Sequence, residues 1–173
     1  MVVIRDAVAD DVGQITALRN ALLASTTYEW TDEPHTDAET RAWLGQHHAA
    51  GYPVLVAVDE DRREHVLGWA AYGDFRDIAR WPGYRVTVEH TIHVREDAWG
   101  RGVGRRLIAA LADHARAAGK RVLVAAIDGS NAGSIAFHER LGFVVVGRLP
   151  GVGEKHGRRL DLVLLQLALD DVP

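Results

Sequence analysis

The chain has 173 residues, enough for one domain with a sizeable core, and its 47% hydrophobic and 25% charged residues are typical of a soluble globular protein. The sequence contains no cysteine, which excludes disulfides, thiolate zinc sites and a cysteine nucleophile, and no apolar run near the roughly 20 residues of a membrane span. The formal net charge is −4, which argues against nucleic-acid binding. The acidic start MVVIRDAVADD lacks a signal-peptide core. We therefore expect a single domain over residues 1–173, in the cytoplasm, with neither nucleic acid nor membrane as a partner.

Hydrophobic periodicity switches between strand and helix patterns along the chain, with turn residues at the boundaries. In chain order it predicts a strand at 2–8, helices at 9–24 and 36–48, strands at 52–59, 65–73 and 84–94, a helix at 104–118, a strand at 121–127, a helix at 130–142, and strands at 143–149 and 160–169. The segment TDAE is typical of a capping box that opens the second helix. This order predicts a mixed α/β sheet with helices on its faces.

The stretch EHTIHVREDAWGRGVGRRL at residues 89–107 carries Gly100, Gly102 and Gly104 between a β-branched run and a helix pattern. Glycine loses more backbone entropy on folding than any other residue, and it has no side chain to pack. Three glycines at alternate positions therefore indicate that the backbone itself is needed there. A glycine turn that leads into a helix directs unpaired N–H groups and the positive end of the helix dipole at one point, which suits a phosphate. Three nearby arginines add positive charge. The pattern predicts a phosphate-binding turn, with an ordinary tight turn as the alternative.

Several familiar motifs do not fit this sequence. A Rossmann fingerprint needs a glycine three residues after its second glycine, where Arg105 stands, and no Gly-Lys-Ser/Thr of a P-loop is present. Neither Ser130 nor Ser134 has the flanking glycines of a nucleophile elbow. His90 and His93 lie three apart on a predicted strand, so they point to opposite faces and cannot hold one ion together. We expect no metal site.

Two segments carry a resemblance to a known superfamily. WGRGVG at 99–104, followed by a helix, resembles the pyrophosphate-binding motif of the GCN5-related N-acetyltransferases (GNAT). SNAGSIAFHERLGF at 130–143 resembles their second signature, an Asn and an aromatic-rich helix that ends in Leu-Gly-Phe. TVEHTIHV at 87–94 and KHGRRLDLVLLQ at 155–166, together with AFHERLGF, resemble segments of the phosphinothricin and methionine sulfoximine acetyltransferases. The chain departs from the first motif at Trp99, where Gln or Arg is usual.

The resemblance implies a GNAT fold with a single mixed, mostly antiparallel central sheet of about seven strands and helices on both faces. It also implies acetyl-CoA as co-substrate, a small amine or amino-acid-like substrate such as phosphinothricin or methionine sulfoximine, and a homodimer. Direct transfer in a ternary complex is expected, because no nucleophile for an acyl-enzyme stands out. Segments 74–83 and 150–159 look like lids on a small pocket. Two alternatives stay open: an acetyltransferase for protein N-termini or aminoglycosides, and a non-catalytic acyl-CoA-binding module.

Two residues are candidates for proton transfer. An ammonium has no lone pair, so the amine must lose a proton before it attacks a thioester, and the resemblance gives that base to Glu89. An ordinary solvent-facing strand Glu is the alternative. His138 stands where many family members have a Tyr, and an imidazole can protonate the departing thiolate near neutral pH. A structural histidine on the helix surface is the alternative.

The remaining candidates follow from the same resemblance. Those expected to contact the cofactor are Ile92, His93, Val94, Trp99, Gly100, Arg101, Gly102, Val103, Gly104, Arg105, Asn131 and Ser134. Those expected to contact the substrate are Trp30, Arg76, Tyr84, Arg85 and Thr91. The arginines fit because a guanidinium binds a carboxylate or phosphinate through two parallel hydrogen bonds.

Overall fold

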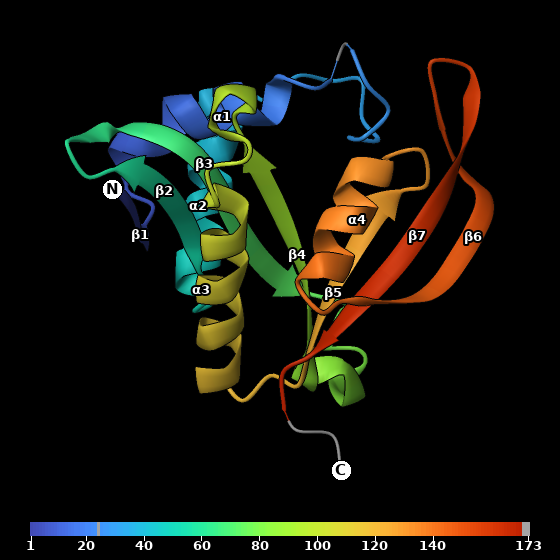
Figure 1. Ribbon diagram of the computed structural model, residues 1–173. Helices are drawn as coiled ribbons and strands as arrows, with labels where there is room; N and C mark the ends of the chain where they lie inside the picture. Colours follow the sequence, from blue (N-terminus) through green and yellow to red (C-terminus); the bar gives the residue numbers. More distant parts are fainter. Residues whose placement is uncertain (24, 171–173) are drawn as a thin grey trace. The chain divides into compact units, whose positions relative to one another are not determined.

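The predicted strands and helices form one seven-stranded sheet and its covering helices in the computed structural model, which describes residues 1–23 and 25–170. The elements are β1 (Val2–Asp6), η1 (Ala9–Asp11), α1 (Val12–Asn20), α2 (Asp37–Ala49), β2 (Val54–Asp59), β3 (Arg62–Asp74), η2 (Pro82–Val86), β4 (Thr87–Val94), η3 (Glu96–Ala98), α3 (Val103–Ala117), β5 (Val122–Asp128), α4 (Ala132–Arg140), β6 (Val144–Lys155) and β7 (Arg158–Ala168). The strand order is β1-β2-β3-β4-β5-β7-β6 (Figure 1). The β4–β5 pair is parallel, whereas the β1–β2, β2–β3, β5–β7 and β6–β7 pairs are antiparallel. The expected mixed, mostly antiparallel sheet is confirmed.

The chain divides into two compact units that share β4. The first unit comprises residues 1–21, 35–73 and 91–114, and the second comprises 22–34, 74–90 and 115–173. The first therefore holds β1, β2, most of β3, the end of β4, helices α1 and α2, and most of α3. The second holds the start of β4, strands β5 to β7 and α4.

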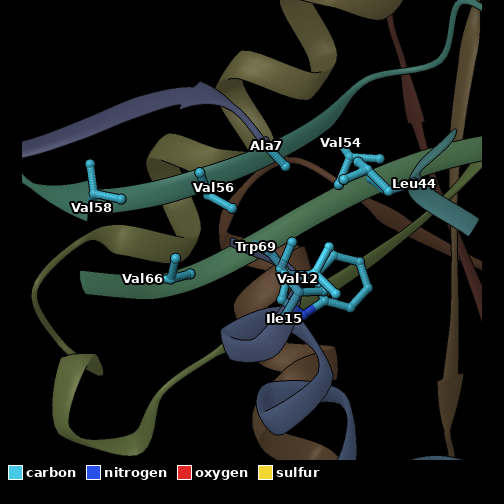
Figure 2. Packing of buried hydrophobic residues seen from close by; sticks show 10 residues of the cluster. Ala7, Val12, Ile15, Leu44, Val54, Val56, Val58, Val66 and Trp69 are labelled. Carbon is cyan, nitrogen blue, oxygen red and sulfur yellow. The ribbon is translucent and has the colours of Figure 1, made fainter. Parts of the chain in front are cut away.

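The core of the first unit lies where α1 and α2 cover β2 and β3. Its buried members are Ala7, Val12, Ile15, Leu44, Val54, Val56, Val58, Val66, Trp69 and Ala71, of which Figure 2 labels all but the last. The three valines of β2 alternate with residues that face the opposite side, as a strand buried on both faces requires. On that other side, Tyr72 hydrogen-bonds His114 of α3 with 2.7 Å between phenol oxygen and Nδ1, and burial raises the pKa of Tyr72 to about 12.

Local hydrogen bonds explain why the first helix is shorter than expected. The guanidinium of Arg5 donates to both carboxylate oxygens of Asp11, at 2.7 and 2.8 Å. The same carboxylate accepts the backbone N–H of Val8 at 2.8 Å. These contacts hold residues 9–11 in the 3-10 helix η1, so that α1 begins at Val12. The prediction of a helix over 9–24 is therefore wrong at its start and too long at its end, while Ala24 lies outside the described residues.

The second helix begins as its sequence predicts. The Thr36 hydroxyl accepts the N–H of Glu39 at 3.2 Å, and the Glu39 carboxylate accepts the N–H of Thr36 at 2.8 Å. This reciprocal capping box is the one expected from TDAE.

Two expectations in the second unit need correction. Segment 150–159, expected as a loop, is the end of a long hairpin in which β6 continues to Lys155 and β7 begins at Arg158 (Figure 1). The hairpin closes at His156 and Gly157, whose φ angles of 51° and 69° are both left-handed, as in a tight two-residue turn. Residues 84–86, expected as the start of a strand, belong to the 3-10 helix η2, which Pro82 begins.

A pair of glycine substitutions tests the packing between β3 and β4. A Cβ on Gly68 would lie 2.7 Å from the His93 carbonyl oxygen, whereas a Cβ on Gly45 of α2 would meet nothing within 4 Å. We predict that Gly68→Ala lowers the free energy of unfolding by about 1–3 kcal/mol through overpacking. Gly45→Ala should raise it by about 0.5–1 kcal/mol through helix propensity. Denaturant unfolding measures both changes, and an unchanged midpoint for Gly68→Ala would contradict the close approach of these strands.

Candidate functional site

The glycine turn predicted to bind a phosphate lies between the end of β4 and α3, in the first unit. Gly100 and Gly102 have φ angles of 73° and 76°, a region that L side chains rarely adopt. A Cβ at either position would meet nothing within 4 Å, so backbone conformation rather than crowding requires glycine here. Arg106 N–H donates to the Gly102 carbonyl at 3.1 Å, as the first turn of α3. The helical N–H groups at 103–105 precede that bond and stand at the positive end of a 15-residue helix.

Side chains of this turn are tied back to neighbouring strands. Arg101 donates to the Asp59 carboxylate at the end of β2, at 3.0 Å. Arg106 donates to the carbonyl of Val2 at 3.2 Å. Arg105 is exposed and has no partner within the described part of the chain, so it is the arginine of the turn that an anion can recruit without breaking another contact.

Trp99 stands where the motif usually has Gln or Arg, and its side chain makes a contact that the motif does not predict. Its side chain is 61% exposed, yet its indole Nε1–H donates to the Val94 carbonyl at 2.9 Å. The residue at the departing motif position therefore binds the last carbonyl of β4. The N–H of Arg95 donates to Leu67 of β3 at 2.9 Å, so the backbone of Val94, one residue earlier, faces away from β3.

The predicted cofactor residues of β4 differ in what they can offer. The imidazole of His93 is 9% exposed and stacks on Trp69, with ring centroids 4.9 Å apart and planes 12° apart. The His93 ring is therefore packed against Trp69. Ile92 and Val94 are half-buried, and Thr91 is exposed.

Glu89 lies in the second unit, near a charged and aromatic group from segment 74–86. Its carboxyl is half-buried; burial raises the pKa of Glu89 above its ordinary value, and the positive charge of Arg76 partly opposes this. The Arg76 guanidinium lies 4.7 Å from the centre of the Phe75 ring, which Tyr84 contacts edge-on at 5.9 Å. Two predicted substrate residues are thus linked through Phe75, a residue that the sequence analysis missed.

His138 lies on α4 in a buried group of rings. It is 2% exposed and stacks on His90 with ring centroids 5.1 Å apart. Its Nδ1 lies 2.7 Å from the Ser134 carbonyl, and a carbonyl can only accept, so the proton of the neutral ring is on Nδ1. Burial lowers the pKa of His138, although the bond to Ser134 partly opposes this, and burial lowers the pKa of His90 to about 3, with His138 adding to the effect. Both rings are therefore neutral at pH 7.

The strand period separates the two predicted proton-transfer residues. Glu89 and His90 are consecutive on β4, so their side chains point to opposite faces of the sheet. His138 stacks on His90 and therefore lies on the face away from Glu89. Within the described residues Nε2 of His138 and both ring nitrogens of His90 are buried without a hydrogen-bond partner. The structure thus does not bring Glu89 and His138 together, and it leaves an unprotonated, unpaired Nε2 on His138.

The other predicted residues of the second unit lie at the start of α4, in the loop before α2 and in η2. The Asn131 side-chain oxygen caps α4 by accepting the N–H of Ser134 at 3.0 Å. Trp30 donates its indole N–H to Asp128 at 3.1 Å. Arg85 is exposed and donates to the Pro82 carbonyl at 3.3 Å. Asp128 was missed from sequence, although its place at the end of a buried strand, just before the Ser-Asn cap, is a usable signal.

Neither a metal cluster nor a spanning helix is found in the described part of the chain. Within residues 1–23 and 25–170, no three His, Cys, Asp or Glu side chains are grouped so that they could hold a metal ion. Over the same residues, none of the helices is both long and apolar enough to cross a bilayer.

Comparison of the chain with known proteins identifies its family. The model of the acetyltransferase (GNAT) family matches residues 15–143. The L-methionine sulfoximine/L-methionine sulfone acetyltransferase of Pseudomonas paraeruginosa is 46% identical over 167 residues, covering 96% of this chain and 94% of the relative. The phosphinothricin N-acetyltransferase of Alcaligenes faecalis is 36% identical over 169 residues, which cover 97% of this chain and 81% of the relative. The resemblance to these two kinds of acetyltransferase is confirmed.

A solved structure agrees in fold. The GNAT superfamily phosphinothricin acetyltransferase of Sinorhizobium meliloti, crystallised in complex with acetyl-CoA, matches with a TM-score of 0.88 and 34% identity. The match covers 96% of this chain and 88% of that one. Together, the family model, these relatives and the seven-stranded sheet show that the chain belongs to the GNAT family of acetyltransferases.

Proposed function

We propose that the protein transfers the acetyl group of acetyl-CoA to the amino group of a small amino-acid-like compound of the methionine sulfoximine or phosphinothricin type. The observation that carries this proposal is Glu89, a half-buried carboxylate on β4 whose pKa is raised by burial and which has Arg76 nearby. Such a substrate requires a base that deprotonates its amine and a cation that binds its acidic group. Glu89 and Arg76 are suited to these two roles. The names of the relatives at 46% and 36% identity support the same substrate class.

The first unit has the features that acetyl-CoA requires. Left-handed glycines with open space and the N–H groups that begin α3 fit a pyrophosphate, and Arg105 adds a positive charge that has no other partner in the described residues. We assign the pyrophosphate to the backbone of residues 100–105, and the pantetheine arm to β4, where the backbone groups of Ile92 and Val94 face away from β3 and His93 lies between them. Asn131 and Ser134, at the start of α4 in the second unit, are proposed as cofactor contacts from the resemblance alone. Bound acetyl-CoA supplies an activated thioester carbonyl.

Glu89 accepts the proton of the substrate ammonium, directly or through one water, and leaves the nitrogen lone pair free to attack. A nitrogen–carbon bond forms, the carbon–sulfur bond breaks, and the thiolate receives a proton. Nδ1 of His138 holds its proton against the Ser134 carbonyl, so its basic atom is Nε2. We therefore assign His138 a shuttle role: Nε2 takes the second proton of the attacking nitrogen once the nitrogen–carbon bond has formed, and it returns that proton to the sulfur as the carbon–sulfur bond breaks. Substrate contacts are assigned to Trp30, Arg76, Tyr84, Arg85 and Thr91.

We further propose that residues 1–173 act as one acetyltransferase domain, as a homodimer and in the cytoplasm. The edge strand β6 supports self-association, since Val144 is 62% exposed and Val146 is 53% exposed on it. An unpaired edge with exposed valines is a surface that proteins usually cover. Size-exclusion chromatography with light scattering measures the mass directly.

The substrate assignment is tested by thiol release from acetyl-CoA. Phosphinothricin, methionine sulfoximine, methionine sulfone and common amino acids form one panel, and aminoglycosides and N-terminal peptides form a second. We expect turnover in the first panel, and turnover confined to the second would assign another amine class. Binding of acetyl-CoA without release of thiol from any amine would point to a non-catalytic sensor.

Removal of the base separates chemistry from binding. We predict that Glu89→Gln lowers kcat by about 10²-fold or more, because general-base catalysis contributes at least that much. The Kd for acetyl-CoA should stay within about twofold, because Glu89 makes no contact assigned to the cofactor. The wild-type rate should also fall as pH drops through the raised pKa of Glu89, where the protonated acid can no longer accept a proton. Equal turnover of the variant would refute the role of Glu89.

Two glycines with the same backbone conformation separate strain from cofactor binding. Gly102 and Gly51 have φ angles of 76° and 72°, and a Cβ on either would meet nothing within 4 Å. Replacement of either by Ala should cost about 1–2 kcal/mol of stability, because both are left-handed. We predict that Gly102→Ala also weakens acetyl-CoA binding by about tenfold, the equivalent of one misplaced phosphate contact. Calorimetry should show unchanged binding for Gly51→Ala, and equal losses in the two variants would reject the pyrophosphate turn.

A further inference from the structure

The loop that carries Trp30 is fastened to strands of its own unit at several points. Thr27 lies 3.5 Å from Ser130, oxygen to oxygen, and Trp30 donates to Asp128 at the end of β5. Asp32 lies 3.3 Å from Nε2 of His156 in the β6–β7 turn. These residues, with the loop at 25–34, all belong to the second unit. The loop therefore has a defined place although it contains neither helix nor strand.

Lys155, the last residue of β6, makes a further attachment. Its Nζ donates to the Leu23 carbonyl at 2.8 Å and to the Glu29 carbonyl at 2.7 Å. The residue is 2% exposed, and it has no carboxylate in ion-pair contact within the described residues. A buried ammonium is costly unless its protons are satisfied. Here two backbone carbonyls, six residues apart in the loop, satisfy two of its three protons.

Trp30 shows what this attachment achieves. Its ring lies so close to Gly153 of β6 that a Cβ there would come within 2.5 Å of a ring carbon. Its indole N–H is directed to Asp128, whose carboxylate also accepts from the N–H and hydroxyl of Ser130. Burial opposes ionisation of Asp128, but these hydrogen bonds outweigh it and lower its pKa. The Glu29 carbonyl held by Lys155 immediately precedes Trp30, so the ammonium fixes the backbone from which the indole projects.

We propose that Lys155 is a positioning residue for the substrate: its ammonium binds the carbonyls of Leu23 and Glu29 and so sets the place of Trp30 against the amino-acid-like compound. The inference rests on the proposed function, because it takes Trp30 as a substrate contact. Lys155 itself does not touch the substrate. An apolar side chain of the same length would fill the space but remove the ammonium donor from both carbonyls, and we expect the loop to move away from β6 toward water.

The first experiment compares Lys155→Met with Glu154→Met, which places the same side chain at the exposed neighbouring position on β6. We expect Lys155→Met to raise KM for the amine by about tenfold or more, since a small misplacement of a positioning group has effects of that size. KM for acetyl-CoA should stay within about twofold, because the glycine turn lies in the other unit. Hydrogen exchange of peptides over 22–34 should become faster in Lys155→Met and remain unchanged in Glu154→Met.

The second experiment restores the charge chemically. The chain has no cysteine, so Lys155→Cys carries a single thiol. Alkylation of the unfolded variant with 2-bromoethylamine and refolding yields a lysine analogue, and iodoacetamide yields a neutral side chain of similar length. The aminoethyl form should recover the wild-type KM for the amine and slow exchange over 22–34. The neutral form should behave as Lys155→Met, with refolded wild-type protein as the reference.

The outcomes separate this inference from the proposed function. If the wild-type protein acetylates none of the amines, the proposed function fails, whatever the exchange data show. If it does acetylate them and Lys155→Met loses stability while KM for the amine is unchanged, Lys155 is merely structural and the inference is overturned. Failure of both Lys155→Met and Lys155→Gln to fold would overturn it too, since the ammonium would then serve the whole unit rather than the loop.

Discussion

The two-residue repeat of β4 is the constraint on which the rest of this structure depends. Eight residues, from Thr87 to Val94, pair with β5 at one end and approach β3 at the other, so that one strand serves both compact units. Strand geometry then sends consecutive side chains to opposite faces. A half-buried carboxylate faces one way at Glu89, and the stacked imidazoles of His90 and His138 lie on the other. The strand therefore separates the carboxylate from the imidazole pair.

The polar groups of the second unit are of two kinds: burial disfavours the charged form of some, and hydrogen bonds hold the others in place. His90 and His138 are kept neutral by burial, and Glu89 is shifted in the same sense, toward the uncharged acid. Asp128 and Lys155 are held by hydrogen bonds to nearby N–H, O–H or carbonyl groups. Burial makes the charged form of the first kind costly, whereas groups of the second kind act as fixed points. The proposed chemistry uses the first kind, and the loop with Trp30 is fastened by the second.

Most of the fold was predictable because its signals are local. The capping box of α2 and the glycine turn before α3 each depend on a few neighbouring residues, and both appear where expected. The β6–β7 hairpin was not predictable in this way: its turn uses His156 in a left-handed conformation, where Asn or Gly would be the usual signal. The burial of Lys155 is also invisible in sequence, because its partners lie more than a hundred residues away. The separation of Glu89 from His138 follows from stacking between β4 and α4, which no local pattern encodes.

Trp99 has a consequence for the length of any ligand that lies along β4. The backbone of Val94 faces away from β3, so its N–H and carbonyl are on the side that a strand-like ligand would use. The indole of Trp99 already occupies that carbonyl. A ligand in this position can bond to Ile92 and to the N–H of Val94, but it must give up the last acceptor of the strand or displace the indole. The Trp99 side chain thus limits how many hydrogen bonds β4 can make to such a ligand. The residue at this motif position therefore affects how far along the strand a ligand can pair.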